Sequence, residues 1–171
     1  MAEPGSLIAR ARAQREARRA ARKPLDLDVP GYGGTLVVRY GALDWNATHR
    51  VLTNERDDAQ ATLEDNLDTI VKACRALMVR DEAGELVSLA DELRAAGEQV
   101  AGEVRFDEVA LEALELPPVP AAVRSKARAA ALAIFGEATS PELAVSLHAG
   151  AIGAWMHGAD AMVDEEAAGN S

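Results

Sequence analysis

The chain has 171 residues, a formal net charge of −10 and one cysteine, Cys74. This length suits one domain with an arm, the acidic charge disfavours binding to nucleic acid or anionic membranes, and a lone cysteine excludes an internal disulfide and a cysteine-based metal cluster. No apolar run reaches the roughly 18 residues needed to cross a bilayer, and the basic N-terminus lacks the apolar stretch of a secretory signal. A cytoplasmic protein is therefore expected.

Residues 1–23 form a basic arm. They hold seven cations and two anions, whereas the other 148 residues hold 11 cations and 26 anions. Residues 6–22 favour a helix that ends before Pro24 and is marginally stable or disordered on its own. Three interpretations stay open: a solvated tail, a contact with acidic protein surface on the same or another chain, and a contact with nucleic acid or membrane phosphate. The last is weakened because the arm has no aromatic residue to stack on bases. The candidate contact residues are Arg12, Arg15 and Arg19.

A β-hairpin is predicted over about 25–40. Apolar and acidic residues alternate over 25–29, turn residues fill 30–34, and the segment from Thr35 to Tyr40 is rich in β-branched residues. Leu36, Val38 and Tyr40 are expected on its buried face. Because a lone hairpin is unstable in water, it has to pack on helices or pair with another strand.

From Asp44 onward the pattern is helical. The apolar residues from Leu63 to Met78 share one stripe, which predicts a single long helix. Four more helices are predicted: 89–96, 107–116, 121–135 and 140–166. Asp107 is expected to cap the second of these, and Ser140, followed by Pro141 at the first helical position, to cap the last. Together these elements predict a mainly α fold, with one compact helical domain over 24–166, the small hairpin at its start and a disordered tail over 167–171.

Small residues recur every four positions in the last predicted helix. They are Gly150, Ala154 and Gly158, with Trp155 beside them. This spacing allows another helix to approach closely. Tight packing inside the helical domain is the favoured interpretation, and a surface for a dimer or another partner is the alternative.

No catalytic, cofactor or metal site is predicted. His148 and His157 lie nine residues apart on one helix and face opposite sides, so they cannot bind one metal ion. The glycine-rich segment 31–34 lacks the Gly-Lys-Ser/Thr of a phosphate loop. Cys74 lies on the apolar stripe and is expected to be an inert core residue. We therefore expect a protein that is not an enzyme and needs no cofactor.

The order of these segments resembles a known family. An extended VPGYGGTLVVRY segment (29–40) precedes the helix core DNLDTIVKAC (65–74) and the segment VRDEAGELV (79–87). There follow VRFDE (104–108), an Ala-rich helix that ends in IFG (134–136), and a final helix that contains Ala154-Trp155. Over roughly 26–158 the chain resembles the tail assembly chaperones of long-tailed, siphovirus-type bacteriophages, especially those that infect actinobacteria.

The resemblance implies a small, acidic, mostly helical protein without catalytic activity. It implies that the protein binds the hydrophobic tape measure protein and keeps it soluble while the tail tube assembles. It also implies a place in the host cytoplasm, absence from the mature virion, and a −1 ribosomal frameshift near the end of the short reading frame. Gly169-Asn170 is compatible with a slippery sequence there. No membrane or nucleic-acid partner is expected, and homo-oligomerisation is left open.

Two other classes of function are considered. One is a small acidic helical adaptor or virion structural protein of another phage module, of the head completion type. The other is a nucleic-acid-binding regulator that uses the basic arm, which would bind DNA with a steep salt dependence.

Overall fold

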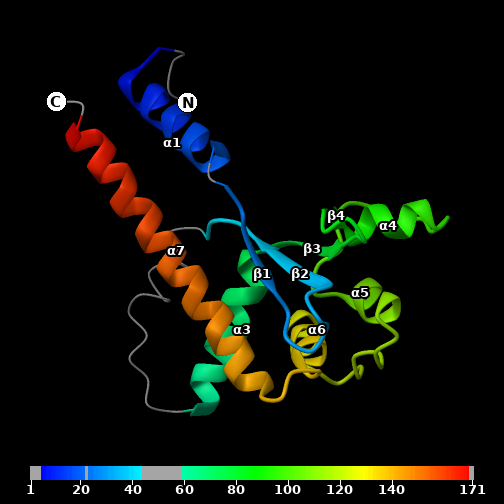
Figure 1. Ribbon diagram of the computed structural model, residues 1–171. Helices are drawn as coiled ribbons and strands as arrows, with labels where there is room; N and C mark the ends of the chain where they lie inside the picture. Colours follow the sequence, from blue (N-terminus) through cyan, green and yellow to red (C-terminus); the bar gives the residue numbers. More distant parts are fainter. Residues whose placement is uncertain (1–4, 22, 44–58, 170–171) are drawn as a thin grey trace.

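The computed structural model describes residues 5–21, 23–43 and 59–169, with only the backbone described for 19–21, 59–61 and 157–169. These ranges contain six helices and a four-stranded antiparallel sheet (Figure 1). The elements are α1 (Leu7–Ala21), β1 (Leu25–Asp28), β2 (Leu36–Tyr40), α3 (Ala59–Ala73), β3 (Cys74–Arg80), β4 (Leu86–Ser88), α4 (Leu89–Ala95), α5 (Glu108–Ala113), α6 (Lys126–Phe135) and α7 (Pro141–Gly169). The fold is mixed α and β, so the prediction of a mainly α fold is wrong.

The predicted hairpin is confirmed, and its strands β1 and β2 lie at one edge of the sheet. The strand order is β1-β2-β3-β4, and β1 pairs with β2 so that Leu27 lies opposite Val38. Leu36, Val38 and Tyr40 are all buried, as expected. Gly31 in the connecting turn has a φ of 96° and lies so close to the backbone of Glu137 that a Cβ atom would clash. A glycine is therefore required there.

The single helix predicted from Leu63 to Met78 is wrong from Cys74 onward. α3 ends at Ala73, and the chain continues at once as β3, which pairs with β2 on one side and β4 on the other. Leu77 and Met78 lie on opposite faces of the sheet, and both are buried. A strand that is buried on both faces has a continuous apolar run, which periodicity alone cannot distinguish from a helix.

Helices α3, α5, α6 and α7 cover one face of the sheet. The main core joins residues of β2 and β3 to residues of α3, α5, α6 and α7, and α3 packs against both α6 and α7. Figure 1 shows α7 crossing the molecule beside α3, with β1 and β2 nearby. A smaller apolar cluster lies on the other face of the sheet: Val37, Ala76, Met78 and Leu86.

Ion pairs flank that smaller cluster. Arg39 donates two hydrogen bonds to Asp26, its cross-strand neighbour, at 2.9 and 3.0 Å. Arg80 donates to Asp28 at 3.0 Å and to the backbone oxygen of Gly34 at 3.1 Å. Such partly exposed pairs contribute at most about 1 kcal/mol each to stability.

Two of the helices begin at the predicted capping residues, and a third begins later than predicted. Asp107 caps α5 by accepting from the amide of Ala110 at 2.9 Å. α7 begins at Pro141, as predicted, and the hydroxyl of Ser140 accepts from the amide of Leu143 at 3.4 Å. α6 begins later than predicted, because Ser125 supplies its cap. The helical segment expected from Asp44 falls mostly on residues 44–58, outside the described ranges.

Candidate protein-interaction site

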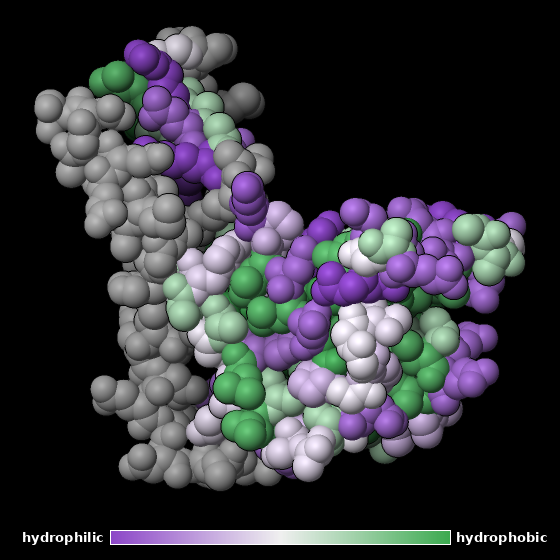
Figure 2. All heavy atoms as spheres, viewed as in Figure 1, coloured by the Kyte–Doolittle hydropathy of each residue, from purple (hydrophilic) through white to green (hydrophobic). Residues whose placement is uncertain are grey.

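The outward face of α7 carries exposed leucines. Leu143 and Leu147 are 58% and 62% exposed, and Gly150 and Ala154 are exposed on the same side. The spacing of four, three and four residues places these side chains on one helical face. We call these four residues the α7 stripe. Figure 2 shows apolar residues at the surface over the first part of α7.

The inward face of α7 is also apolar. Val145, Ala149, Ile152 and Met156 are buried in the main core. From position 143 to position 159 the sequence contains no Asp, Glu, Lys or Arg. A helix that is apolar all round is normally buried on every side. Within the described ranges, no helix is both long enough and apolar enough to cross a bilayer. Because α7 is apolar on both faces and the α7 stripe is exposed, the stripe is a candidate site for contact with another protein.

The four small and aromatic residues predicted as an interaction site do not lie on one surface. Gly150 and Ala154 are exposed, and a Cβ atom at Gly150 would meet nothing within 4 Å. The favoured interpretation, tight packing inside the domain, is therefore wrong for these two. Trp155 is half-buried and packs against the main core. Gly158 lies within α7, but its surroundings are outside the description.

Sequence reasoning missed Leu143 and Leu147. Both leucines lie on the helical face that also carries Gly150, and the 17-residue stretch without a charged side chain contains all three. That uncharged stretch was available in the sequence. It would have indicated a helix with two apolar faces, one more than a surface helix needs.

The basic arm forms helix α1. Arg12 and Arg15 are exposed, and neither forms an ion pair with any residue in the described ranges. Leu7 and Ile8 at the start of this helix are 80% and 61% exposed. Arg19 also belongs to α1, although its side chain is outside the description. Figure 1 shows α1 and the C-terminal part of α7 projecting from the body. The arm is thus presented to solvent.

His148 fastens the inward face of α7 to the sheet. Its Nε2 lies 2.9 Å from the backbone oxygen of Asp28, which can only accept, so Nε2 carries the proton. Nδ1 is then an acceptor for the hydroxyl of Tyr40 at 2.8 Å. The ring also packs edge-on against Phe135. Burial lowers the pKa of His148, which keeps it neutral. His148 is therefore a buried core residue with both ring nitrogens hydrogen-bonded.

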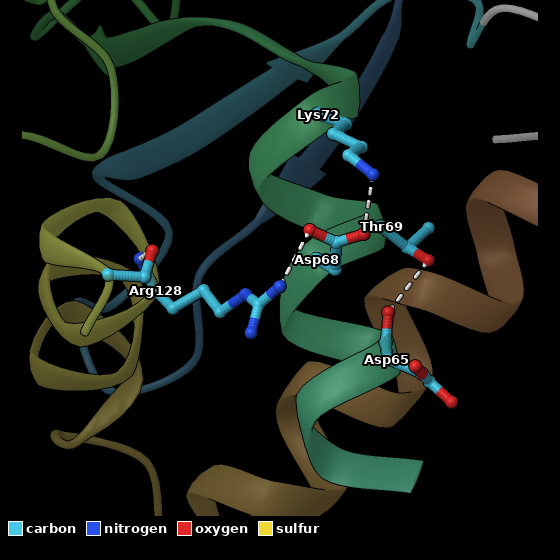
Figure 3. A network of polar contacts seen from close by, with 6 residues as sticks. Asp65, Asp68, Thr69, Lys72 and Arg128 are labelled. Carbon is cyan, nitrogen blue, oxygen red and sulfur yellow. Dashed lines mark hydrogen bonds and ion pairs between the residues drawn. The ribbon is translucent and has the colours of Figure 1, made fainter. Parts of the chain in front are cut away.

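A polar network joins α3 to α6 (Figure 3). Asp68 accepts from Lys72, four residues further along α3, at 2.7 Å and from Arg128 of α6 at 3.1 Å. Partial burial raises the pKa of Asp68, but the hydrogen bonds from Lys72 and Arg128 outweigh it and hold the pKa below its ordinary value. Thr69 donates to the backbone oxygen of Asp65 at 3.0 Å. Because the carboxylate of Asp68 pairs with the side chains of Lys72 on α3 and Arg128 on α6, it contributes to the packing of α6 against α3.

The single cysteine is buried, and the described carboxylates form no metal-binding group. Cys74 is buried at the start of β3, and burial raises its pKa to about 12, so the thiol stays protonated. Among the described residues, no group of three or more His, Cys, Asp or Glu side chains could hold a metal ion.

No protein family, curated protein or solved structure matches this chain.

Proposed function

We propose that this protein is a phage tail assembly chaperone, which covers apolar helical segments of a tape measure protein and keeps them soluble during tail tube assembly. The observation that carries the proposal is the α7 stripe, an exposed apolar face on a helix whose other face is fixed in the core. The identity of the client comes from the resemblance over residues 26–158. We place the chaperone in the host cytoplasm and outside the finished virion.

The physical chemistry suits this role. A client helix can lay its apolar side along the α7 stripe, as amphipathic helices do in many peptide-binding proteins. The net charge of −10 keeps the resulting complex soluble by repulsion between particles. The exposed arginines of α1 can add contacts to acidic segments of the same client. None of these functions requires a catalytic group.

The sheet departs from the mostly helical structure that the resemblance implies. In the proposed role, the sheet and the helices α3 and α6 form the support that holds α7 in place. His148 contributes by joining α7 to β1 and β2. Helix α7 is the element on which the proposal depends.

Co-expression with a tape measure protein tests the proposal. The gene for the client is taken from the same genome, and the soluble fraction of the client is measured with and without this protein. We expect a large increase in soluble client. Leu147→Glu, which places a charge on the stripe, should reduce it strongly. Leu132→Glu is the matched control, because it makes the same change at an exposed leucine on α6, outside both α7 and the basic arm. Equal client solubility with and without the protein would refute the proposal.

Purified virions distinguish the proposal from the alternative of a head completion or other virion structural protein. Mass spectrometry should find this chain in infected cells and not in finished particles. A stoichiometric amount in particles would instead support the virion structural role.

A further inference from the structure

We infer that the α7 stripe pairs with the α7 stripe of a second copy of this chain when no client is present, in an antiparallel and two-fold symmetric contact. The starting observation is that Leu143, Leu147, Gly150 and Ala154 form an exposed row of two large and two small residues. A row of this kind can be complementary to itself, as a two-fold interface requires.

The positions of the large and small residues match in an antiparallel pair. If the two-fold axis passes level with the bond between residues 148 and 149, Leu147 lies level with Gly150 of the second copy. In the same arrangement Leu143 lies level with Ala154 of the second copy. Each leucine therefore meets a small residue, and the helices can approach closely at four places. Ser146, exposed beside Leu147, lies level with Ala151 of the second copy, which is also small.

Charge favours the antiparallel direction. The sequence after the stripe is acidic, with Asp160, Asp164, Glu165 and Glu166 and no Lys or Arg. A parallel pair would place the two acidic ends side by side, whereas an antiparallel pair sends them to opposite ends. The two bodies still repel each other, because each chain has a net charge of −10. The dimer should therefore become tighter as salt concentration rises.

The contact is expected to be weak and reversible. A stable interface needs about 1,000 Å² of buried surface, and a single pair of helices buries less than that. The free protein would then cover its stripe with a second copy and expose it again when a client competes. This release step rests on the proposed function, whereas the dimer itself does not.

Sedimentation velocity of the full chain, without any client, tests the dimer. The wild type is expected to change from monomer to dimer as its concentration rises through the micromolar range. Leu147→Ala removes the large residue, and Gly150→Leu fills the small one; each should raise the dissociation constant about tenfold. Both positions are exposed, and Gly150 has open space around it, so both variants should fold.

The dissociation constant of the double variant Leu147→Ala with Gly150→Leu is the decisive measurement. It exchanges the large and small residues in both copies, so the introduced alanine of one copy faces the introduced leucine of the other and the fit is restored. Recovery of the wild-type dissociation constant supports the inference. Leu7→Glu should leave the dimer unchanged.

Three results would overturn the inference. One is a wild type that stays monomeric at every concentration and salt concentration. Another is tighter association of Gly150→Leu, which would indicate non-specific apolar contact. The third is loss of the dimer in Leu7→Glu alone, which would assign association to the arm. Client solubilisation is measured separately, so failure of the dimer and failure of the chaperone role are distinguishable.

Discussion

At the residue scale, His148 makes stability depend on pH. The histidine is neutral in the folded protein, because burial lowers its pKa and both ring nitrogens are hydrogen-bonded. In the unfolded chain its pKa returns to about 6.5. Above that pH both states are neutral, and below it only the unfolded state takes up the proton. The free energy of unfolding should therefore fall as pH decreases below about 6.5.

Urea denaturation between about pH 7.5 and pH 5 measures this effect, with a slope from one histidine of at most about 1.4 kcal/mol per pH unit. The control is His148→Gln, which cannot titrate and should show a shallower dependence even if it is less stable throughout. Equal slopes for wild type and variant would contradict the assignment of the effect to His148.

Two tyrosines allow a matched test of the buried network. Tyr40→Phe leaves Nδ1 of His148 as a buried acceptor without a donor, which should cost about 1–3 kcal/mol. Tyr32→Phe removes a hydrogen bond to the backbone oxygen of Ile134 at a half-buried site and should cost less, about 0.5–1.5 kcal/mol. Chemical denaturation of both variants gives the comparison. A larger loss of unfolding free energy for Tyr32→Phe would mean that the hydrogen bond between Tyr40 and His148 contributes less to stability than the one between Tyr32 and Ile134.

At the element scale, the leucines of β3 and α7 differ in burial and therefore in their expected effect on stability. Leu77 in β3 is fully buried, whereas Leu147 in α7 is 62% exposed. Leu77→Ala should reduce the free energy of unfolding by about 2–5 kcal/mol, because it leaves a cavity in the core. Leu147→Ala should change it by less than about 0.5 kcal/mol when measured on dilute protein. A large loss for Leu147→Ala would show that the outward face of α7 is needed for folding.

The polar network between α3 and α6 should contribute little by itself. Arg128 and Asp68 are partly exposed, with 38% and 24% of their side chains accessible. Arg128→Met keeps most of the aliphatic stem and leaves Lys72 to pair with Asp68, so the free energy of unfolding should fall by less than about 1 kcal/mol. Thermal unfolding of this variant at low and high salt measures the effect, and a loss of several kcal/mol would contradict it.

At the scale of the whole molecule, the basic arm and the acidic body set solubility together. The full chain has a sequence pI near 4.8, and its solubility should be lowest close to that pH. Deletion of residues 1–23 removes seven cations and two anions, which makes the chain more acidic. The solubility minimum should then move to lower pH. Turbidity measured against pH for both proteins tests this, and an unchanged minimum would contradict it.

Local patterns in the sequence were enough to predict several elements. The turn residues around Gly31 and the alternation beside it indicated the hairpin, and the capping residues Asp107 and Ser140 marked the starts of α5 and α7. The core role of Cys74 followed from its place on the apolar stripe. Each of these features is decided by residues a few positions apart, which is why the sequence alone was sufficient.

Other features depended on contacts between distant parts of the chain. The change from helix to strand at Cys74 occurs because the free edge of β2 pairs with a segment far along the chain, so that Leu36 lies opposite Val79, a contact that periodicity does not encode. The same holds for the two apolar faces of α7. The sequence determined that this helix is apolar and uncharged over its middle, but only the tertiary structure decided which face enters the core and which remains exposed. That choice follows from how α3 and the sheet pack against α7, because only one side of a helix can be covered by them.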